Sequence, residues 1–168
     1  MRATPIRMLL GGLVLVAAMV VLPAQSQATP PSGVTGSPLV RGSFTDDVSV
    51  RFKVSHGRRT IVAKAKDASQ VVLQNLTFAP GGHTGWHTHP GPVGVTFRSG
   101  SLTYYEGSGR CVGRVYAAGT AFIDPGSGHI HIARNEGTVP VETSVVYFGV
   151  PAGQAPRIDA PAPGNCPF

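Results

Sequence analysis

The stretch GGHTGWHTHPGPVGVTFRSG, residues 81–100, decides which fold the chain can adopt. His87 and His89 lie one residue apart in it, and a second such pair, His129 and His131, follows about forty residues later. Because side chains along a β-strand alternate between two faces, each pair places both imidazoles on the same side of a sheet. Two such strands can surround one divalent cation, which imidazole nitrogens commonly bind. The sequence therefore predicts a small metal-binding β-protein.

Composition and patterning favour one domain built from short strands. The chain has 168 residues, with 22 Gly and 15 Pro, which suits a single domain with many tight turns. Alternating apolar residues between turn residues predict strands over 48–54, 60–65, 71–79, 93–98, 102–105, 114–116, 120–123, 129–133 and 141–150. Short strands of even spacing indicate a closed or double-sheet barrel, which leaves few unpaired edges.

Residues 1–28 are expected to be a signal peptide. Arg2 and Arg7 precede an apolar run over 8–22, and small residues at 26–28 offer a cleavage site after Ala28. The run is shorter than the roughly 20 residues that a membrane helix needs, so a retained anchor is the less favoured alternative. We therefore expect a secreted or extracytoplasmic chain with no stable membrane association after cleavage.

The remaining chain divides into three parts. We expect a lead segment with edge strands over 29–67, a barrel over 68–150 and a C-terminal tail over 151–168. The lead begins with Pro, Gly, Ser and Thr residues that lack periodicity, which is typical of a flexible segment. The strands over 48–54 and 60–65 would be edge strands that lengthen the barrel.

Charge and cysteine content narrow the partners and the compartment. Without Arg2 and Arg7, 12 basic and 8 acidic residues leave a formal charge of +4. The basic residues are scattered rather than gathered with aromatics, so nucleic acid is not an expected partner. Cys111 and Cys166 form an even pair in a chain bound for an oxidising compartment, which favours a disulfide over free thiols. That bond would tie the tail to the barrel.

Two spaced motifs carry the strongest signal. In the first, five residues separate Gly81 from His87. One residue separates His87 from His89, and Gly100 ends the motif. These spacings resemble the first motif of the cupins, in which three or four residues separate the second histidine from a Glu. Val93 or, with the longer spacing, Gly94 stands in that position here.

The second motif resembles the cupin pattern in the same order. Gly119, Pro125, His131 and Asn135 match it, with one extra residue between the proline and the histidine. The resemblance spans about residues 70–150 and implies an all-β, cupin-type jelly-roll β-barrel of six to eight strands. It also implies a metal ion inside the barrel, and pairing of two copies into a homodimer through an edge strand such as 48–54.

Carried over residue by residue, the resemblance implies three metal ligands, His87, His89 and His131. A cupin without the Glu resembles the three-histidine subgroup, which includes iron-dependent thiol dioxygenases and members with no demonstrated metal. Burial of these histidines without a metal is the competing interpretation, but burying several imidazoles without a partner costs free energy. One divalent ion is therefore the expected cofactor.

The walls of the predicted site are mostly apolar. Val93, Val95 and Phe97 share one strand face, which places the missing Glu position on an inward apolar side. Tyr104 is a candidate pocket residue and proton donor, with packing as the alternative. Three neutral ligands leave a cation with its full charge and open coordination positions, which suits an anionic substrate, dioxygen or activated water.

Metal identity and the other histidines are less determined. Imidazoles bind zinc, manganese, iron or copper, and zinc or manganese is favoured because ferrous iron oxidises readily outside the cytosol. His129 is a candidate fourth ligand in place of the Glu, with solvent exposure as the alternative. His83 is a candidate rim residue that contacts substrate, again with exposure as the alternative.

The sequence leaves the function open between classes. One hypothesis is a metal-dependent oxidoreductase, dioxygenase-like, that acts on a small molecule. The alternative is a non-catalytic protein that binds a metal or a small ligand, and a third interpretation treats the histidines as remnants of an ancestral site. Against the enzyme stands the expected absence of a carboxylate near the metal. Cupins carry many activities, so the family resemblance does not choose between them.

Overall fold

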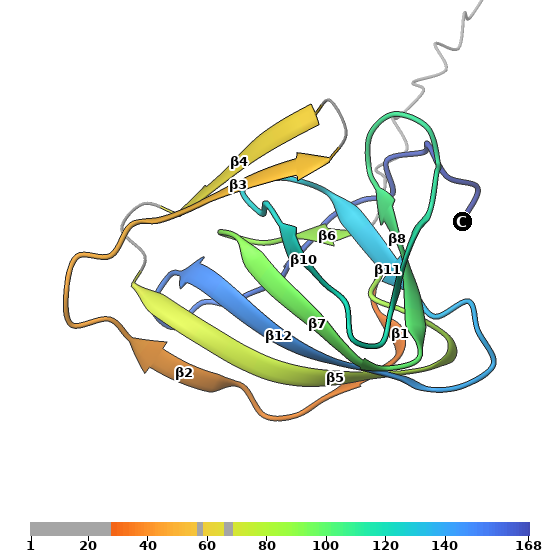
Figure 1. The fold of residues 1–168 in the computed structure, drawn as a ribbon, viewed down its shortest axis with the longest axis horizontal. Coiled ribbons are helices and arrows are strands. Elements are labelled where there is room, and N and C mark those ends of the chain that lie inside the picture. The colour runs from red at the N-terminus through yellow and green to blue at the C-terminus, as the bar shows by residue number, and fades with distance from the viewer. Residues whose placement is uncertain (1–27, 57–58, 66–68) are drawn as a thin grey trace, which may run out of the picture.

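The computed structural model describes residues 28–56, 59–65 and 69–168, and every regular element among them is a β-strand (Figure 1). The predicted signal peptide, apart from Ala28, lies outside these residues. Within the described part of the chain, no helix is long and apolar enough to cross a membrane.

Eight strands form two facing halves of one antiparallel sheet that curls into a nearly closed barrel (Figure 1). The first half has the order β5 (Gln70–His83), β12 (Val141–Val150), β7 (Val93–Ser99), β10 (Ala121–Asp124). The second half has the order β6 (His87–Thr88), β11 (His131–Arg134), β8 (Ser101–Glu106), β9 (Arg114–Ala117). His83 pairs with Arg134, which joins the halves along one side.

This strand order is that of a jelly roll. Along the chain, successive strands alternate between the two halves except at the hairpin of β8 and β9. Two interleaved Greek keys produce such an order, and the result covers the apolar face of each half with the other. The prediction of an all-β jelly-roll barrel is confirmed.

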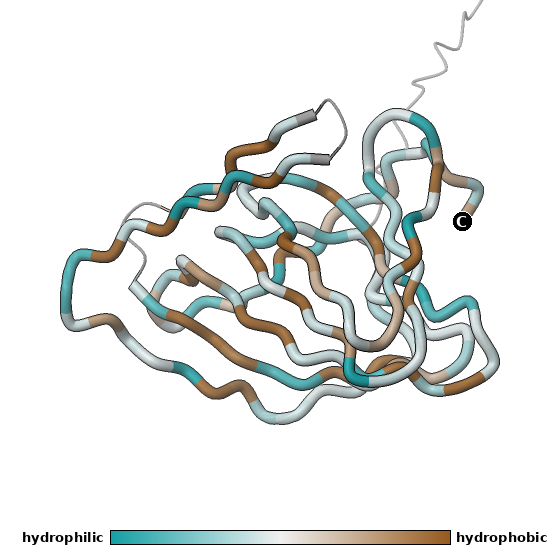
Figure 2. Tube along the Cα trace, in the orientation of Figure 1, coloured by the Kyte–Doolittle hydropathy of each residue, from teal (hydrophilic) through white to brown (hydrophobic). Residues whose placement is uncertain are grey.

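The alternation that predicted strands also fills the barrel. Along β12, every second residue from Val141 to Tyr147 is buried, while the residues between them are partly exposed. Figure 2 shows brown and paler residues alternating along the barrel strands in the same way. Two groups of buried apolar side chains result: Val72, Val93, Val145, Tyr147 and Val150, and Phe78, Phe97, Leu102 and Val141.

The N-terminal segment adds strands that the sequence did not predict. Strands β1 (Ser32–Gly36) and β2 (Val40–Ser43) both pair with β5, so part of the lead expected to be flexible is a paired strand. Gly, Ser and Thr residues give little local strand signal, and the pairing is decided by the free edge of the long β5.

The two predicted edge strands exist but do not lengthen the barrel. Strands β3 (Val50–His56) and β4 (Arg59–Ala65) form a separate hairpin sheet among the described residues, and it lies over one end of the barrel (Figure 1). The Phe52 ring contacts Phe148 at 5.5 Å between centroids, and Ala63 and Ala65 are buried. Packing of this apolar face onto the barrel end replaced edge pairing.

The C-terminal tail is fixed to the second half of the barrel. Strand β13 (Ile158–Asp159) pairs with β6, and Cys111 and Cys166 form the predicted disulfide, with 5.1 Å between their Cα atoms. Phe168 stacks on the buried Trp86 with 6.4 Å between ring centroids. The disulfide closes a long loop. By restricting the unfolded chain, it should stabilise the fold by about 4 kcal/mol.

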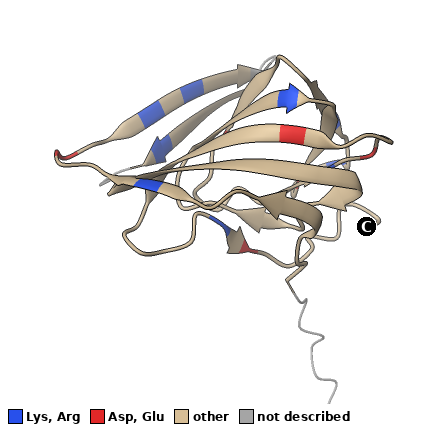
Figure 3. Cartoon of the chain, turned by 90° about the horizontal axis from the view of Figure 1, so that it is seen from below, with Lys and Arg blue, Asp and Glu red and all other residues tan. Residues whose placement is uncertain are grey.

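Basic residues are spread over several strands of this fold rather than gathered on one face. Figure 3 shows Lys and Arg in separate bands on several strands, with few acidic residues among them. The two histidine motifs meet in the interior of the barrel, away from these surface charges.

Candidate metal centre

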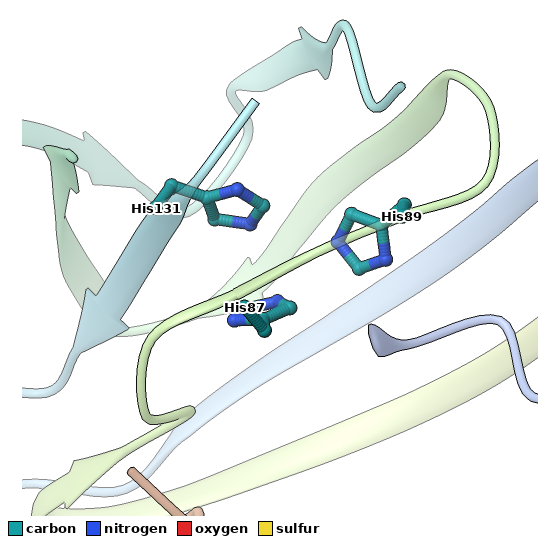
Figure 4. Close-up of side chains that lie close together, drawn as sticks. All are labelled: His87, His89 and His131. Atoms are coloured by element: carbon teal, nitrogen blue, oxygen red, sulfur yellow. The ribbon is translucent and has the colours of Figure 1, made fainter. Parts of the chain in front are cut away.

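Three histidines from the two motifs meet inside the barrel. His131 of β11 is paired directly with His87 of β6, and His89 follows just beyond β6. All three are buried, and Figure 4 shows their rings turned toward one another. The ring of His131 lies 4.2 Å from that of His87 and 5.2 Å from that of His89, between centroids. One nitrogen from each ring lies within 4.8 Å of the others, so they can ligate one ion.

The remaining nitrogen of each ring is held by an acceptor. The Nδ1 atoms contact backbone carbonyl oxygens, with His87 on Gly85 at 2.9 Å, His89 on Pro156 at 2.8 Å and His131 on His129 at 3.3 Å. A carbonyl oxygen can only accept, so Nδ1 carries the proton in the neutral ring and Nε2 keeps its lone pair. Metal-binding histidines are oriented in this way. The three rings therefore present lone pairs from Nε2.

Burial also keeps these rings neutral. Desolvation lowers the pKa of His87 well below its usual value, with the neighbouring His131 as the next cause. It lowers the pKa of His89 to about 4 and lowers that of His131 as well. Protonated imidazole has no lone pair for a metal, so the neutral form is the one that ligates.

The sequence interpretation missed a buried carboxylate that lies against the second histidine pair. Asp124 is 2% exposed, and its Oδ2 accepts from the Tyr104 hydroxyl at 2.6 Å and from Nδ1 of His129 at 3.1 Å. The same oxygen lies 3.3 Å from Nδ1 of His131. The expectation that no carboxylate lies near the site is therefore wrong. The dipeptide Asp124-Pro125 indicated a turn, and that signal hid the role of the side chain.

The charge of Asp124 is stabilised by its neighbours. Burial alone would raise its pKa, but the His131 ring and hydrogen bonds from His129 and Tyr104 outweigh burial and lower the pKa below its usual value. Its Oδ1 also accepts from the backbone N–H of Gly126 at 2.8 Å, as in an Asx turn. An ionised carboxylate with this many donors can orient His131, but few of its lone pairs remain for a metal.

His129 lies in this network rather than with the other two histidines. It groups with Asp124 and His131, as a second set of side chains close enough to share an ion. Its Nδ1 faces the Asp124 carboxylate and the Tyr104 hydroxyl, which explains the short distances by hydrogen bonding alone. The role of His129 as a fourth ligand stays a prediction.

The predicted pocket residues lie together around the three-histidine cluster. Val93, Val95, Phe97 and Tyr104 line one small cavity with His87 and His89. Val93 is 1% exposed, so an apolar side chain fills the position where the motif has Glu. Tyr147 also lines the cavity, and burial raises its pKa to about 12. The cavity walls are therefore apolar apart from the imidazoles, a few hydroxyls and the carboxylate of Asp124.

Two other motif residues have structural positions. His83 lies at the end of β5, where its Nδ1 accepts from the N–H of Gly85 at 3.1 Å, and it is not among the described residues that line the cavity. Asn135 is buried, and its amide donates to the carbonyls of Phe78, Ala79 and Val139. It holds the turn after β11, as its place in the sequence predicted.

Comparison with known proteins gives matches in structure alone. No family model matches the chain, and no curated protein matches it. A conserved protein with a double-stranded β-helix domain from Klebsiella pneumoniae is 25% identical, with 67% of this chain and 84% of that one covered and a TM-score of 0.45. A cupin domain from Bordetella pertussis is 19% identical, with 64% and 99% covered and a TM-score of 0.42.

A third similar structure is the Cupin_2 domain of an XRE family transcriptional regulator from Enterobacter cloacae. It is 19% identical, with 48% of this chain and 82% of that one covered and a TM-score of 0.40. The strand order of the chain itself identifies the jelly roll, and the two motifs that resemble those of cupins place their histidines side by side within it. The chain is thus a jelly-roll barrel whose two histidine motifs resemble those of cupins.

Proposed function

We propose that the barrel binds one divalent metal ion through His87, His89 and His131. The observation that carries this proposal is the hydrogen bonding of the three rings. Each Nδ1 contacts a carbonyl oxygen, so Nε2 of each ring keeps its lone pair, and the three buried rings lie close enough to share one ion. Three buried imidazoles without a cation or proton would cost desolvation free energy for no gain in packing.

We further propose a metal-dependent oxidoreductase, dioxygenase-like, that acts on a small molecule. A bound ion would supply Lewis-acid or oxygen chemistry at the coordination positions that three protein ligands leave open. Asp124 fixes the orientation of His131, and the apolar walls at Val93 and Phe97 keep bulk water from the site. The hydroxyl of Tyr104 lies on the cavity wall, where its hydrogen bond to Asp124 holds it in place.

A non-catalytic metal-binding or ligand-binding protein is the second candidate. The commitment of Asp124 to several donors favours it, because a carboxylate held in this way is a weak base. The proposed metal is zinc, manganese, iron or copper, which histidine ligands alone do not separate.

Export is proposed with this function. The apolar segment after Arg2 and Arg7 and the disulfide between Cys111 and Cys166 both support an oxidising compartment outside the cytoplasm. A small-molecule ligand is the proposed partner, and pairing into a homodimer remains a proposal.

Metal content tests the centre. The purified protein, stripped with a chelator and titrated with zinc or manganese, should bind one ion per chain by inductively coupled plasma mass spectrometry. His87→Ala should lose the ion, whereas His83→Ala, a histidine outside the cavity lining, should keep it. Equal retention by the His87→Ala variant would contradict the proposed ligand set.

Oxygen consumption separates the two candidates. The metal-loaded protein should consume dioxygen with at least one member of a panel of thiols and phenols if it is an oxidoreductase. Binding of panel members by calorimetry, without turnover under any metal, would favour the non-catalytic candidate.

A further inference from the structure

The C-terminal tail lies against the segment that carries the first histidine pair. Strand β13 of the tail pairs Asp159 with His87. The carbonyl of Pro156, two residues before β13, accepts the hydrogen bond from Nδ1 of His89 at 2.8 Å. A hydrogen bond to the second nitrogen fixes the orientation of a histidine that binds a metal. The tail therefore positions one proposed ligand directly, through the carbonyl of Pro156.

Little of the tail is buried. Among its residues, all of which the structure describes, only Pro156 and Ala160 are buried. Beyond β13, the amide of Asn165 donates to the backbone carbonyl of Glu106 at 2.9 Å, and Phe168 is 40% exposed. A segment that buries so little apolar surface gains little free energy to offset the conformational entropy that it loses on ordering. A covalent link is the strongest restraint that the tail has.

The disulfide provides this link. Cys166 of the tail is bonded to Cys111, which lies in the loop between β8 and β9 (Figure 1). Strand β8 ends at Glu106, the residue paired with His131. The bond thus ties the segment that positions His89 to the strand that pairs with His131. Both cysteines are partly exposed, so small thiols and disulfides can reach them for exchange.

We propose that oxidation of Cys111 and Cys166 completes the metal centre, because the tail holds the ring of His89 in its ligating orientation only while the disulfide is formed. This inference depends on the proposed metal site. In the oxidation, each thiol loses one proton and one electron, the S–S bond forms, and a small disulfide such as oxidised glutathione is reduced to two thiols. With the proposed export, the centre would reach its full affinity only in an oxidising compartment.

Zinc affinity with and without the disulfide tests the proposal. The Cys111→Ser/Cys166→Ser variant of the full chain removes the bond and leaves no thiol that could bind the metal. Its zinc Kd should be about 10- to 100-fold higher than that of the oxidised wild-type protein, the loss typical of removing a partner that orients a ligand. Competition with a chromophoric chelator measures both values. An equal Kd in a variant that circular dichroism shows to be folded would overturn the proposal and leave the metal centre standing.

A core variant separates positioning from loss of stability. Val72 is fully buried on β5, a strand that does not pair with β13, and it is not among the described residues that line the histidine cavity. Val72→Ala should lower the unfolding free energy, as truncation in a core does, and leave the zinc Kd unchanged. A rise in Kd as large as that of the double-serine variant would overturn the proposal, because stability alone would then explain both.

The histidine rings give a second readout that a general loss of stability would not move. In the metal-free protein, long-range ¹H–¹⁵N NMR distinguishes a ring protonated at Nδ1 from one protonated at Nε2. Removal of the disulfide should give His89 a mixture of the two forms, because it weakens the contact with Pro156. His87 should keep its proton on Nδ1, since the carbonyl of Gly85 holds it without the tail. An unchanged His89 ring would overturn the proposal.

Reduction of the wild-type protein replaces the variant if the double-serine chain is unfolded. Zinc-loaded protein is treated with a phosphine reductant in the presence of excess EDTA, with oxidised protein in EDTA as the control. Zinc should leave the reduced protein faster than the oxidised one, and before the strand signal in circular dichroism is lost. Release of zinc only together with that signal would overturn the proposal. Failure of the oxidised wild-type protein to bind zinc would overturn the metal centre and, with it, this inference.

Discussion

The two His-x-His pairs look alike in the sequence but differ in the structure. His87 and His89 both join the central cluster, and both are oriented by backbone carbonyls. Of the second pair, only His131 joins that cluster, while His129 faces Asp124. Identical spacing therefore does not guarantee identical roles, because parity fixes a side chain only where the backbone is regular.

The local backbone explains the difference. Strand β11 begins at His131, so His129 precedes it and follows a turn in which Ser127 has a φ of 52° and Gly128 a φ of 89°. Left-handed residues redirect the chain before the strand starts. The carboxylate of Asp124 then provides a partner for the displaced ring.

Loss of the His131 side chain should reduce zinc affinity more than loss of the His129 side chain. In the His131→Ala variant, zinc affinity should fall more than about 100-fold, since loss of a ligand exceeds the 10- to 100-fold typical of residues that orient one. Competition with a chromophoric chelator measures this affinity. A fall in affinity no larger than that of His129→Ala would show that the two rings contribute equally to zinc binding.

A Glu at position 93, where the cupin motif has one, tests whether that position faces the ion proposed to be bound by His87 and His89. Val93→Glu buries a charge without a partner in the metal-free protein, which should cost about 3 kcal/mol of unfolding free energy. Added zinc should recover much of that loss, because the new carboxylate would ligate the ion. Urea unfolding with and without zinc measures both values. Val95→Glu is the matched variant on the same strand face, and equal recovery there would contradict the position-specific interpretation.

Removal of the Asp124 charge tests what orients the second pair. Asp124→Asn should weaken zinc binding about 10- to 100-fold, because His131 loses a charged acceptor while the ligand set remains intact. The chelator competition assay reports this change directly. Unchanged affinity would mean that the carbonyl of His129 suffices to hold the ring.

Loss of the His129 side chain should have the smallest effect. His129→Ala removes one donor from Asp124 but no member of the central cluster, so zinc affinity should fall about tenfold or less. Stoichiometry should remain one ion per chain. A loss as large as that of the His131 variant would identify His129 as the fourth ligand that its spacing suggested.

The tail shows a further limit of sequence reasoning. Its composition indicated only a Pro-rich segment tied by a disulfide, yet Pro156 accepts a hydrogen bond from His89 and Asp159 pairs with His87. Neither contact has a signal in local spacing, since more than sixty residues separate the partners. The N-terminal strands β1 and β2 were missed for the same reason, because only the free edge of β5 selects them.

The sequence by itself predicted every strand of the barrel except β6, the shared face of Val93, Val95 and Phe97, the disulfide and the residues that form the three-histidine cluster. These depend on alternation along a strand and on residue chemistry, which are local properties. Tertiary structure alone decided that Asp124 lies against His131, that the hairpin of β3 and β4 covers the barrel end, and that Pro156 accepts a hydrogen bond from His89. Those outcomes require segments far apart in the chain to pack against one another, and the free energy of that packing is absent from any single stretch of sequence.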